Sequence, residues 1–272
     1  MRAYDIVKSQ QDLRRLSWTQ AAFTSGTGGM LLKSREQTGS TLWYCKLSSY
    51  DSYRGVYGHE CVNELVASRL LDILGIEHVR YALVNALVSV DGDELPTWLC
   101  RSPSFRRTGE RKVSLDTFFD LHRKGRESPL DLCRRYGWGE HVRQVALLDY
   151  LIANRDRHGA NMEVLRSRNG VLRLAPLFDN GLSLVFSCYD DEERVRAFEP
   201  LADIRANNYL GSRSLEENLK IIGLPSACGQ LHPQDRAKLL AGLEDVLPQA
   251  HLDKIWDIVW ERWCHVADIR NS

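Results

Sequence analysis

The most constraining feature of the sequence is a pair of short polar motifs in its second half. Residues 154–161 read Asn-Arg-Asp-Arg-His-Gly-Ala-Asn, and residues 178–181 read Phe-Asp-Asn-Gly. Together they supply three oxygen-bearing side chains, Asp156, Asn161 and Asp179, in an order that suits phosphoryl transfer. That reaction needs a carboxylate near the attacking hydroxyl, and a carboxylate and an amide to hold a metal ion on the phosphates. Mg²⁺ takes oxygen ligands, so these residue types fit it.

The sequence between the two motifs predicts how they come together. Two apolar-rich runs flank Asn169-Gly170, which is a strong short-range signal for a β-hairpin. With Asn-Gly as a two-residue turn, residue 161 would stand opposite residue 178. The hairpin is therefore expected to bring Asn161 close to Asp179.

Composition excludes several classes of protein. The 272 residues suffice for one large domain or two lobes. Lys+Arg and Asp+Glu number 36 each, so no net charge favours direct binding to nucleic acid or to an anionic membrane. The sequence contains neither an apolar run of about 18 residues nor the apolar segment of a signal peptide, which predicts a cytoplasmic protein without a membrane span. Its seven cysteines form no C-x-x-C pair, which favours reduced thiols over disulfides or a zinc site.

The first hundred residues predict a small β-rich lobe. Strands are expected at 21–23, 30–33 and 41–47, with turns at 24–29 and 34–39. The first turn contains Ser25, Gly26, Thr27, Gly28 and Gly29. Because glycine has no Cβ, backbone amides in such a turn can approach phosphate oxygens, although an ordinary hairpin tip is the simpler interpretation of the turn taken alone.

A helix is predicted over residues 60–74, where apolar residues recur every three or four positions and Gly75 stands at the expected end. Glu60 and Glu64 share one flank of this helix. In the small lobe of a kinase, a helix glutamate pairs with a strand lysine that holds the nucleotide phosphates. Lys46 is the candidate lysine, and either glutamate could be its partner.

The rest of the chain predicts a hairpin, a linker and a helical lobe. The hairpin is expected from 78–90 and 95–100, with Pro96 favouring an edge position or a late start of the second strand. The polar and basic stretch 102–112 is interpreted as a hinge. Helices are then expected from Ser114, over 140–153, over 233–247 and over 251–269. The second of these is apolar nearly all round, which predicts a buried helix that leads directly into the first polar motif.

The pattern Asn154-x-Asp156-x-His158-x-x-Asn161, with the later Asp179, resembles that of HipA-type serine/threonine kinases in the protein-kinase-like superfamily. The resemblance implies an α+β, bilobal protein-kinase-like fold. Residues 1–101 would form the β-rich, nucleotide-binding lobe, 102–112 the hinge, and 113–272 the mainly helical lobe with the catalytic loop. ATP and Mg²⁺ are the implied cofactors.

The resemblance also implies roles for individual residues. Asp156 would be the catalytic base, with His158 beside it in the catalytic loop, and Asn161 and Asp179 would bind the metal. Lys46 would be the nucleotide lysine. Glu64 is its preferred partner over Glu60, because the length from Glu64 to the end of the helix matches that family. The glycine-rich turn would cover the phosphates.

The expected function is transfer of the γ-phosphate of ATP to a serine or threonine hydroxyl of a protein, with the chain itself as one candidate acceptor. The Asp-Asn-Gly motif at 179–181 also resembles that of phosphoinositide kinases. The alternatives are therefore a lipid or small-molecule kinase and a nucleotide-binding pseudokinase. The tryptophan stripe in 251–269 has no interleaved basic residues and is typical of core packing, so no direct nucleic-acid binding is expected.

Overall fold

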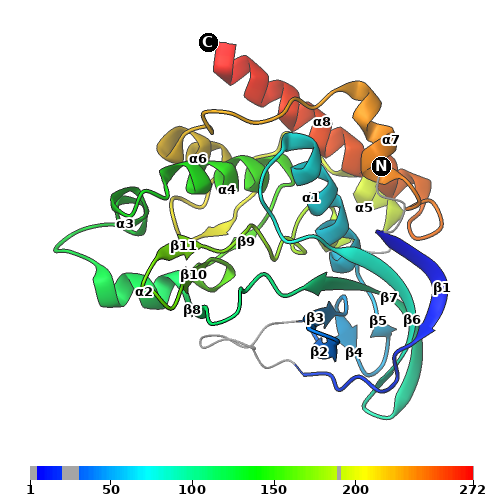
Figure 1. Cartoon of the computed structure of the whole chain (residues 1–272). Coiled ribbons are helices and arrows are strands. Elements are labelled where there is room, and N and C mark those ends of the chain that lie inside the picture. The colour runs from blue at the N-terminus through cyan, green and yellow to red at the C-terminus, as the bar shows by residue number, and fades with distance from the viewer. Residues whose placement is uncertain (1–4, 20–30, 189–190, 272) are drawn as a thin grey trace.

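The computed structural model describes residues 5–19, 31–188 and 191–271. A β-sheet formed by the first part of the chain lies at one end of the molecule, and most of the helices lie at the other (Figure 1). The predicted α+β, two-lobed architecture is confirmed. The predicted strand 21–23 and the glycine-rich turn at 25–29 lie outside the described residues.

The main sheet has the strand order β1-β6-β7-β3-β2. Its strands are β1 (Ile6–Asp12), β2 (Lys33–Thr38), β3 (Thr41–Lys46), β6 (Ala82–Val90) and β7 (Asp93–Pro103). Strand β1 runs parallel to β6, and the remaining neighbours are antiparallel. A short hairpin, β4 (Tyr50–Asp51) and β5 (Gly55–Val56), follows β3. One face of the sheet buries its own apolar cluster, which includes Leu32, Cys45, Leu47 and Leu99.

Helix α1 (Glu60–Leu74) has the predicted bounds. It ends at Gly75, whose φ of +68° is left-handed and whose N–H bonds back to the carbonyl of Leu71 and Asp72. The apolar residues of α1 belong to the large core of the helical lobe and not to the cluster of the sheet. The helix therefore ties the small lobe to the large one.

The large lobe contains seven helices in the described residues. They are α2 (Leu115–His122), α3 (Pro129–Arg135), α4 (Gly139–Leu151), α5 (Glu192–Ala197), α6 (Leu215–Ile222), α7 (Arg236–Leu240) and α8 (Gln249–Asn271). The predicted buried helix is α4, and the tryptophan stripe of α8 packs Trp256 and Trp263 into the core. Within the described parts of the chain, no helix is both long and apolar enough to cross a bilayer.

Short strands and turns hold the polar motifs between these helices. A three-stranded sheet has the order β11-β10-β8, with β8 (Arg111–Ser114), β10 (Glu163–Arg166) and β11 (Leu172–Leu174). A parallel pair joins β9 (Asp156–Arg157) to β12 (Asn207–Asn208). Single 3₁₀ turns occupy Gly159–Asn161, Phe186–Cys188 and Pro233–Asp235.

The predicted turn at 34–39 is wrong. Residues 34–38 belong to β2, and the turn is limited to Gly39 and Ser40. Strand β2 lies at the edge of the sheet with most of its side chains exposed or half-buried, so its sequence lacks the apolar alternation that marks a covered strand. Pro96 behaves as predicted, because it faces Leu87 of β6 in the part of β7 that has no partner in β3.

The predicted two-residue turn at Asn169-Gly170 is also wrong, by one residue of register. The N–H of Ser167 bonds to Val171 O, and the N–H of Gly170 bonds to Ser167 O, both at 3.0 Å. The loop therefore has three residues, with Gly170 in the left-handed conformation at φ +85°. This register places residue 161 level with residue 177 instead of 178.

The last discrepancies concern helix ends. The expected helix at 233–247 ends at Leu240, and Gly242 adopts a left-handed φ of +74° shortly afterwards. Ser114 stands at the N-cap position of α2 as predicted, but its hydroxyl bonds to Asp116 and not to a free amide of the helix. The linker joins the end of β7 at Pro103 to the start of β8 at Arg111, and the boundaries at 101 and 113 stay predictions.

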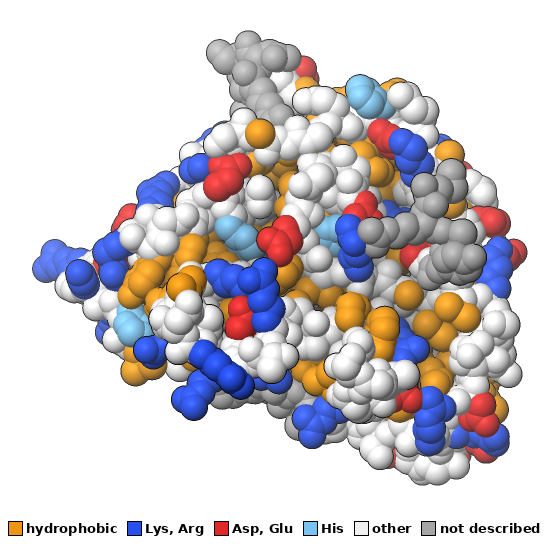
Figure 2. All heavy atoms as spheres, viewed as in Figure 1, with side chains coloured by type: hydrophobic (Ala, Val, Ile, Leu, Met, Phe, Trp, Pro, Cys, Tyr) orange, Lys and Arg blue, Asp and Glu red, His pale blue; other side chains and the backbone are white. Residues whose placement is uncertain are grey.

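Charged side chains of both signs appear across the face of the molecule shown in Figure 2, with apolar groups between them. Neither sign of charge covers this face alone.

The end of α1 provides a test of the fold. A Cβ at Gly75 would meet no atom within 4 Å, so Gly75→Ala introduces backbone strain without a clash. We expect the free energy of unfolding to fall by about 1 kcal/mol in this variant and by less in Gly75→Asn, because asparagine tolerates the left-handed region. Denaturant unfolding measures both, and an unchanged stability in Gly75→Ala would contradict the assigned helix end.

Candidate active site

Three of the predicted site residues meet at one point between the lobes. Lys46 Nζ at the end of β3 lies 2.8 Å from Glu64 Oε1 on α1 and 2.7 Å from Asp179 Oδ1 in the second polar motif. The side chains of Lys46 and Glu64 are 12% and 2% exposed. The structure therefore joins a strand, a helix and a loop through one ammonium group.

The glutamate that pairs with Lys46 is Glu64 and not Glu60. Glu64 also accepts a bond from the N–H of Asn180 through Oε2, at 2.9 Å. Glu60 instead accepts a hydrogen bond from the hydroxyl of Ser49. The preferred alternative from the sequence is thus the one that the structure adopts.

Helix α1 holds the Asp179 motif at several further points. Asn63 Nδ2 donates to the carbonyl oxygens of Gly181 and Ser183, at 2.9 and 2.8 Å. A Cβ on Gly181 would come within 3.1 Å of Glu60 Cβ, which explains a glycine at this close approach. The Asp-Asn-Gly motif is therefore fitted against α1.

Asp179 itself combines an unusual backbone with an unusual charge environment. Its φ of +60° is left-handed, which aspartate tolerates better than most residues do. Burial opposes ionisation of its carboxyl group, but Lys46, Lys33 and Arg157 outweigh burial and hold its pKa well below the ordinary value of 3.8. In turn, burial opposes the charge on Lys46, and Asp179 and Glu64 more than offset this, so the pKa of Lys46 lies well above 10.5. Both groups are charged at neutral pH.

The proposed base, Asp156, lies in β9 with two side chains beside it. Asn207 Nδ2 of β12 donates to Asp156 Oδ1 at 3.2 Å, and His158 Nε2 lies 3.5 Å from Asp156 Oδ2. His158 Nδ1 accepts from the N–H of Ala160, which leaves Nε2 as the protonated nitrogen of the neutral ring. His158 is therefore placed to orient the carboxylate.

Asn161 is held by the same loop. Its Nδ2 donates to the carbonyl of Asp156 at 2.9 Å, and within the described residues no donor occupies its Oδ1. No hydrogen bond joins Asn161 to Asp179 there either. The two motifs meet instead through Arg157, because Arg157 Nη1 donates to the carbonyl of Phe178 at 2.8 Å and lies 3.5 Å from that of Asn161.

Arg157 is the functional residue that the sequence reasoning missed. It is 1% exposed, pairs with Asp149 of α4 at 2.8 Å, and donates to Asn180 Oδ1 at 2.7 Å. Asp149 also accepts from Asn154 Nδ2 at 2.8 Å. This cluster, which we call the Arg157 hub, connects the buried helix to both polar motifs.

Some of these contacts had a sequence signal and others had none. An arginine directly after the proposed base, with Asp149 on the apolar helix before it, is a visible clue to a buried ion pair. Asn207 comes from a distant segment whose pairing with β9 is a tertiary contact. No spacing in the sequence indicates it.

Asn161 and Asp179 carry oxygen donors of the kind that Mg²⁺ prefers. Within the described residues no group of three or more His, Cys, Asp or Glu side chains is arranged to hold a metal. A nucleotide-bound Mg²⁺ does not require one, because phosphates and water complete its shell. Asn161 and Asp179 each offer an oxygen atom to which no described residue donates. These two side chains would hold the metal.

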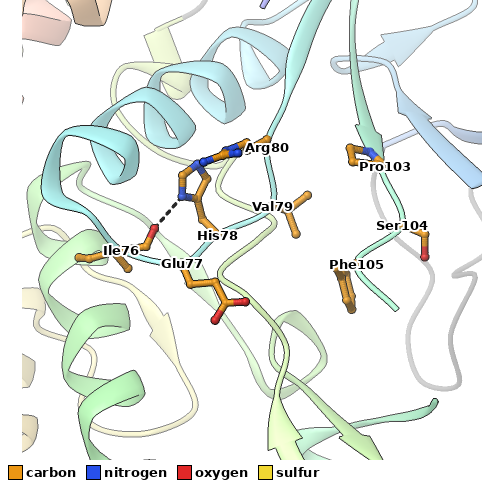
Figure 3. A pocket seen from close by; sticks show the side chains of 8 residues that line it. All are labelled: Ile76, Glu77, His78, Val79, Arg80, Pro103, Ser104 and Phe105. Carbon is orange, nitrogen blue, oxygen red and sulfur yellow. Dashed lines mark hydrogen bonds between the residues drawn. The ribbon is translucent and has the colours of Figure 1, made fainter. Parts of the chain in front are cut away.

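A separate pocket lies at the junction with the linker (Figure 3). It has a volume of about 360 Å³ and is lined by residues 76–80, which follow α1, and by 103–105, which run from the last residue of β7 into the linker. His78 Nδ1 donates to the carbonyl of Ile76 at 2.8 Å and braces the first segment. Lys46, Glu64 and Asp179 are not among the lining residues, but the ring of Phe105 packs against that of Phe178, the residue before Asp179.

Comparison with known proteins identifies the fold as kinase-like. The chain is similar to the proinflammatory kinase CtkA of Helicobacter pylori, with a TM-score of 0.60 and 16% identity over 97% of this chain and 99% of that one. It also matches HipA of Shewanella oneidensis, solved with HipB and operator DNA, with a TM-score of 0.42 and 15% identity over 91% of this chain and 59% of that one. No protein-family model and no curated protein matches the sequence. The likeness to CtkA confirms the kinase-like fold that the motifs predicted.

The Arg157 hub predicts an asymmetric response to substitution. Arg157→Met leaves Asp149 buried without its partner, so the free energy of unfolding should fall by about 3–5 kcal/mol. Replacing both charges, in Arg157→Met/Asp149→Leu, should recover part of that loss. Denaturant unfolding measures the effect. The control is Arg196→Met, because Arg196 is 67% exposed and its ion pair is expected to contribute at most about 1 kcal/mol. A double variant no more stable than Arg157→Met would contradict this account.

Proposed function

We propose that this chain is an ATP- and Mg²⁺-dependent phosphotransferase, and specifically a HipA-like protein serine/threonine kinase. The observation that carries the proposal is the contact of Lys46 with both Glu64 and Asp179. These three residues come from separate stretches that were singled out from the sequence alone. The kinase-like fold around them supports the same conclusion.

The proposed mechanism gives each side chain one task. Bound Mg·ATP supplies the phosphoryl group and a metal ion that neutralises charge on the phosphates. Lys46 keeps its bond to Glu64, and the N–H that now donates to Asp179 turns to a phosphate oxygen when Asp179 binds the metal. Asn161 and Asp179 hold the metal. The glycine-rich turn at Ser25, Gly26, Thr27, Gly28 and Gly29 is proposed to cover the phosphates.

Asp156 acts on the acceptor. Its carboxylate orients the hydroxyl and takes up the proton as the new oxygen–phosphorus bond forms, while the bond from the γ-phosphorus to the bridging oxygen would break and ADP would leave. Asn207 donates to one oxygen of that carboxylate and His158 lies beside the other, so the group is positioned before the acceptor arrives. The backbone of β9 is paired with β12, which holds the whole residue in place.

The proposed acceptor is a serine or threonine of a protein, with this chain itself as one candidate. We place the protein in the cytoplasm, because all seven of its cysteines are free thiols and five are buried, which suits a reducing compartment.

The assignment of roles is tested by substituting the two aspartates. Asp156→Ala and Asp179→Ala should each lower the rate of transfer from γ-³²P-ATP by at least about 100-fold, because each removes a group acting on the reacting atoms. Asp156→Ala should still bind ATP. Glu244→Ala, at an exposed carboxylate outside the site, should keep wild-type activity. Full activity of both aspartate variants would refute the roles.

The same preparation separates the alternative functions. The wild-type protein is incubated with Mg·ATP and a general protein acceptor. Mass spectrometry should then find phosphate on serine or threonine of the acceptor or of the chain itself. Transfer only to phosphatidylinositol vesicles would identify a lipid kinase instead. A melting temperature that does not respond to Mg·ATP, with no transfer to any acceptor, would indicate a pseudokinase.

A further inference from the structure

A second lysine faces the same site as Lys46. Lys33 opens β2 and is the direct cross-strand partner of Lys46 in the antiparallel pair of β2 and β3. Directly opposite residues project from the same face of a sheet. Their neighbours in the chain, Leu32 just before β2 and Leu47 just after β3, belong to the apolar cluster of the sheet. The side chain of Lys33 therefore lies on the face where Lys46 meets Glu64.

The backbone of Lys33 is fixed from both sides. Its N–H donates to the carbonyl of Thr19 at 2.8 Å, and its own carbonyl accepts from the N–H of Thr19 at 3.0 Å. On the other side, the N–H of Leu47 bonds to the carbonyl of Leu32 at 2.9 Å and sets the register with β3. The position of Lys33 opposite Lys46 is thus set by backbone hydrogen bonds and does not depend on a side-chain rotamer.

Lys33 is left without a charge partner of its own. In residues 5–19, 31–188 and 191–271 its half-buried side chain makes no hydrogen bond or ion pair, whereas Lys46 binds both nearby carboxylates. Burial lowers the pKa of Lys33, Asp179 opposes that shift, and Lys46 adds to it. Two lysines placed directly opposite each other destabilise a sheet unless an anion compensates them.

A polyphosphate has the chemistry of a direct partner for Lys33, because Glu64 and Asp179 act on this lysine only at a distance. Once a metal takes Asp179, both lysines lose that carboxylate, and Glu64 alone remains to balance two cations. A nucleotide di- or triphosphate carries several negative charges and many acceptor oxygens, which suit two ammonium groups on one sheet face. We propose that Lys33 is a second phosphate-binding residue, which holds the nucleotide phosphates together with Lys46. This inference rests on the proposed function and adds to it.

The test measures binding of Mg·ADP by calorimetry to wild type, Lys33→Gln, Lys33→Arg and a control, Lys8→Gln. Lys8 lies on exposed β1 at the opposite edge of the sheet, where it pairs with Asp245, and its substitution changes the net charge equally. We expect Lys33→Gln to bind Mg·ADP at least about 10-fold more weakly, from the loss of a charge-assisted hydrogen bond. Lys33→Arg should retain most of the affinity, and Lys8→Gln all of it.

Two further readouts exclude a merely structural role. Adenosine lacks phosphates, so its affinity, measured by competition against a fluorescent ADP, should be the same in wild type and Lys33→Gln. The unliganded Lys33→Gln protein should be at least as stable as wild type to denaturant, because the substitution relieves repulsion between two cations.

Each other outcome has a definite meaning. Equal Mg·ADP affinity in wild type and Lys33→Gln would overturn the inference and leave the proposed function intact. A parallel loss of ADP and adenosine binding, together with lower stability, would overturn it in favour of a structural role. Failure of the wild type to bind Mg·ADP would instead refute the proposed function itself.

Discussion

The rest of the site depends on the ion cluster formed by Lys46, Glu64 and Asp179. An ammonium group in the interior is costly unless carboxylates surround it, and each of these carboxylates is likewise costly without the lysine. The cluster therefore forms as a unit or not at all. Its members belong to β3, α1 and the loop after β11. Their ion pairs and hydrogen bonds therefore hold the small sheet against α1 and α1 against the loop. The relative position of the lobes at the site follows from this charge balance.

The Arg157 hub gives the second half of the site its rigidity. One buried guanidinium contacts Asp149, Asn180 and the backbone of Phe178, so it holds the two polar motifs at a fixed separation. Catalysis by positioning and electrostatics needs such fixed groups, because little reorganisation is then required during the reaction. The proposed metal ligands and the proposed base are thus held in place by residues to which no contact with a substrate is assigned. Loss of the hub would be expected to affect both motifs together.

The sequence predicted those parts of the fold that local patterns encode. The bounds of α1 followed from apolar periodicity and Gly75. Asp179 was singled out by motif order and residue chemistry, and the choice of Lys46 and of Glu64 over Glu60 followed from the resemblance to HipA-type kinases. Strand β2 was missed because an exposed edge strand has no apolar alternation, and the hairpin register was missed because Asn-Gly suits both two-residue and three-residue loops. Asn207 beside Asp156, and Lys33 opposite Lys46, arise from strand pairing. Such pairing is decided by tertiary packing, which no short window of sequence contains.

The central claim is that Lys46, Glu64, Asp179 and Asn161 form one site for a nucleotide and its metal. A crystal structure of the protein with Mg²⁺ and a non-hydrolysable ATP analogue tests it most directly. The account predicts Asp179 and Asn161 oxygens at about 2.0–2.1 Å from the Mg²⁺. It also predicts that Lys46 stays on Glu64 while its bond to Asp179 is replaced by one to a phosphate oxygen. A nucleotide bound elsewhere, or a metal held by other residues with the contact between Lys46 and Asp179 intact, would contradict the account.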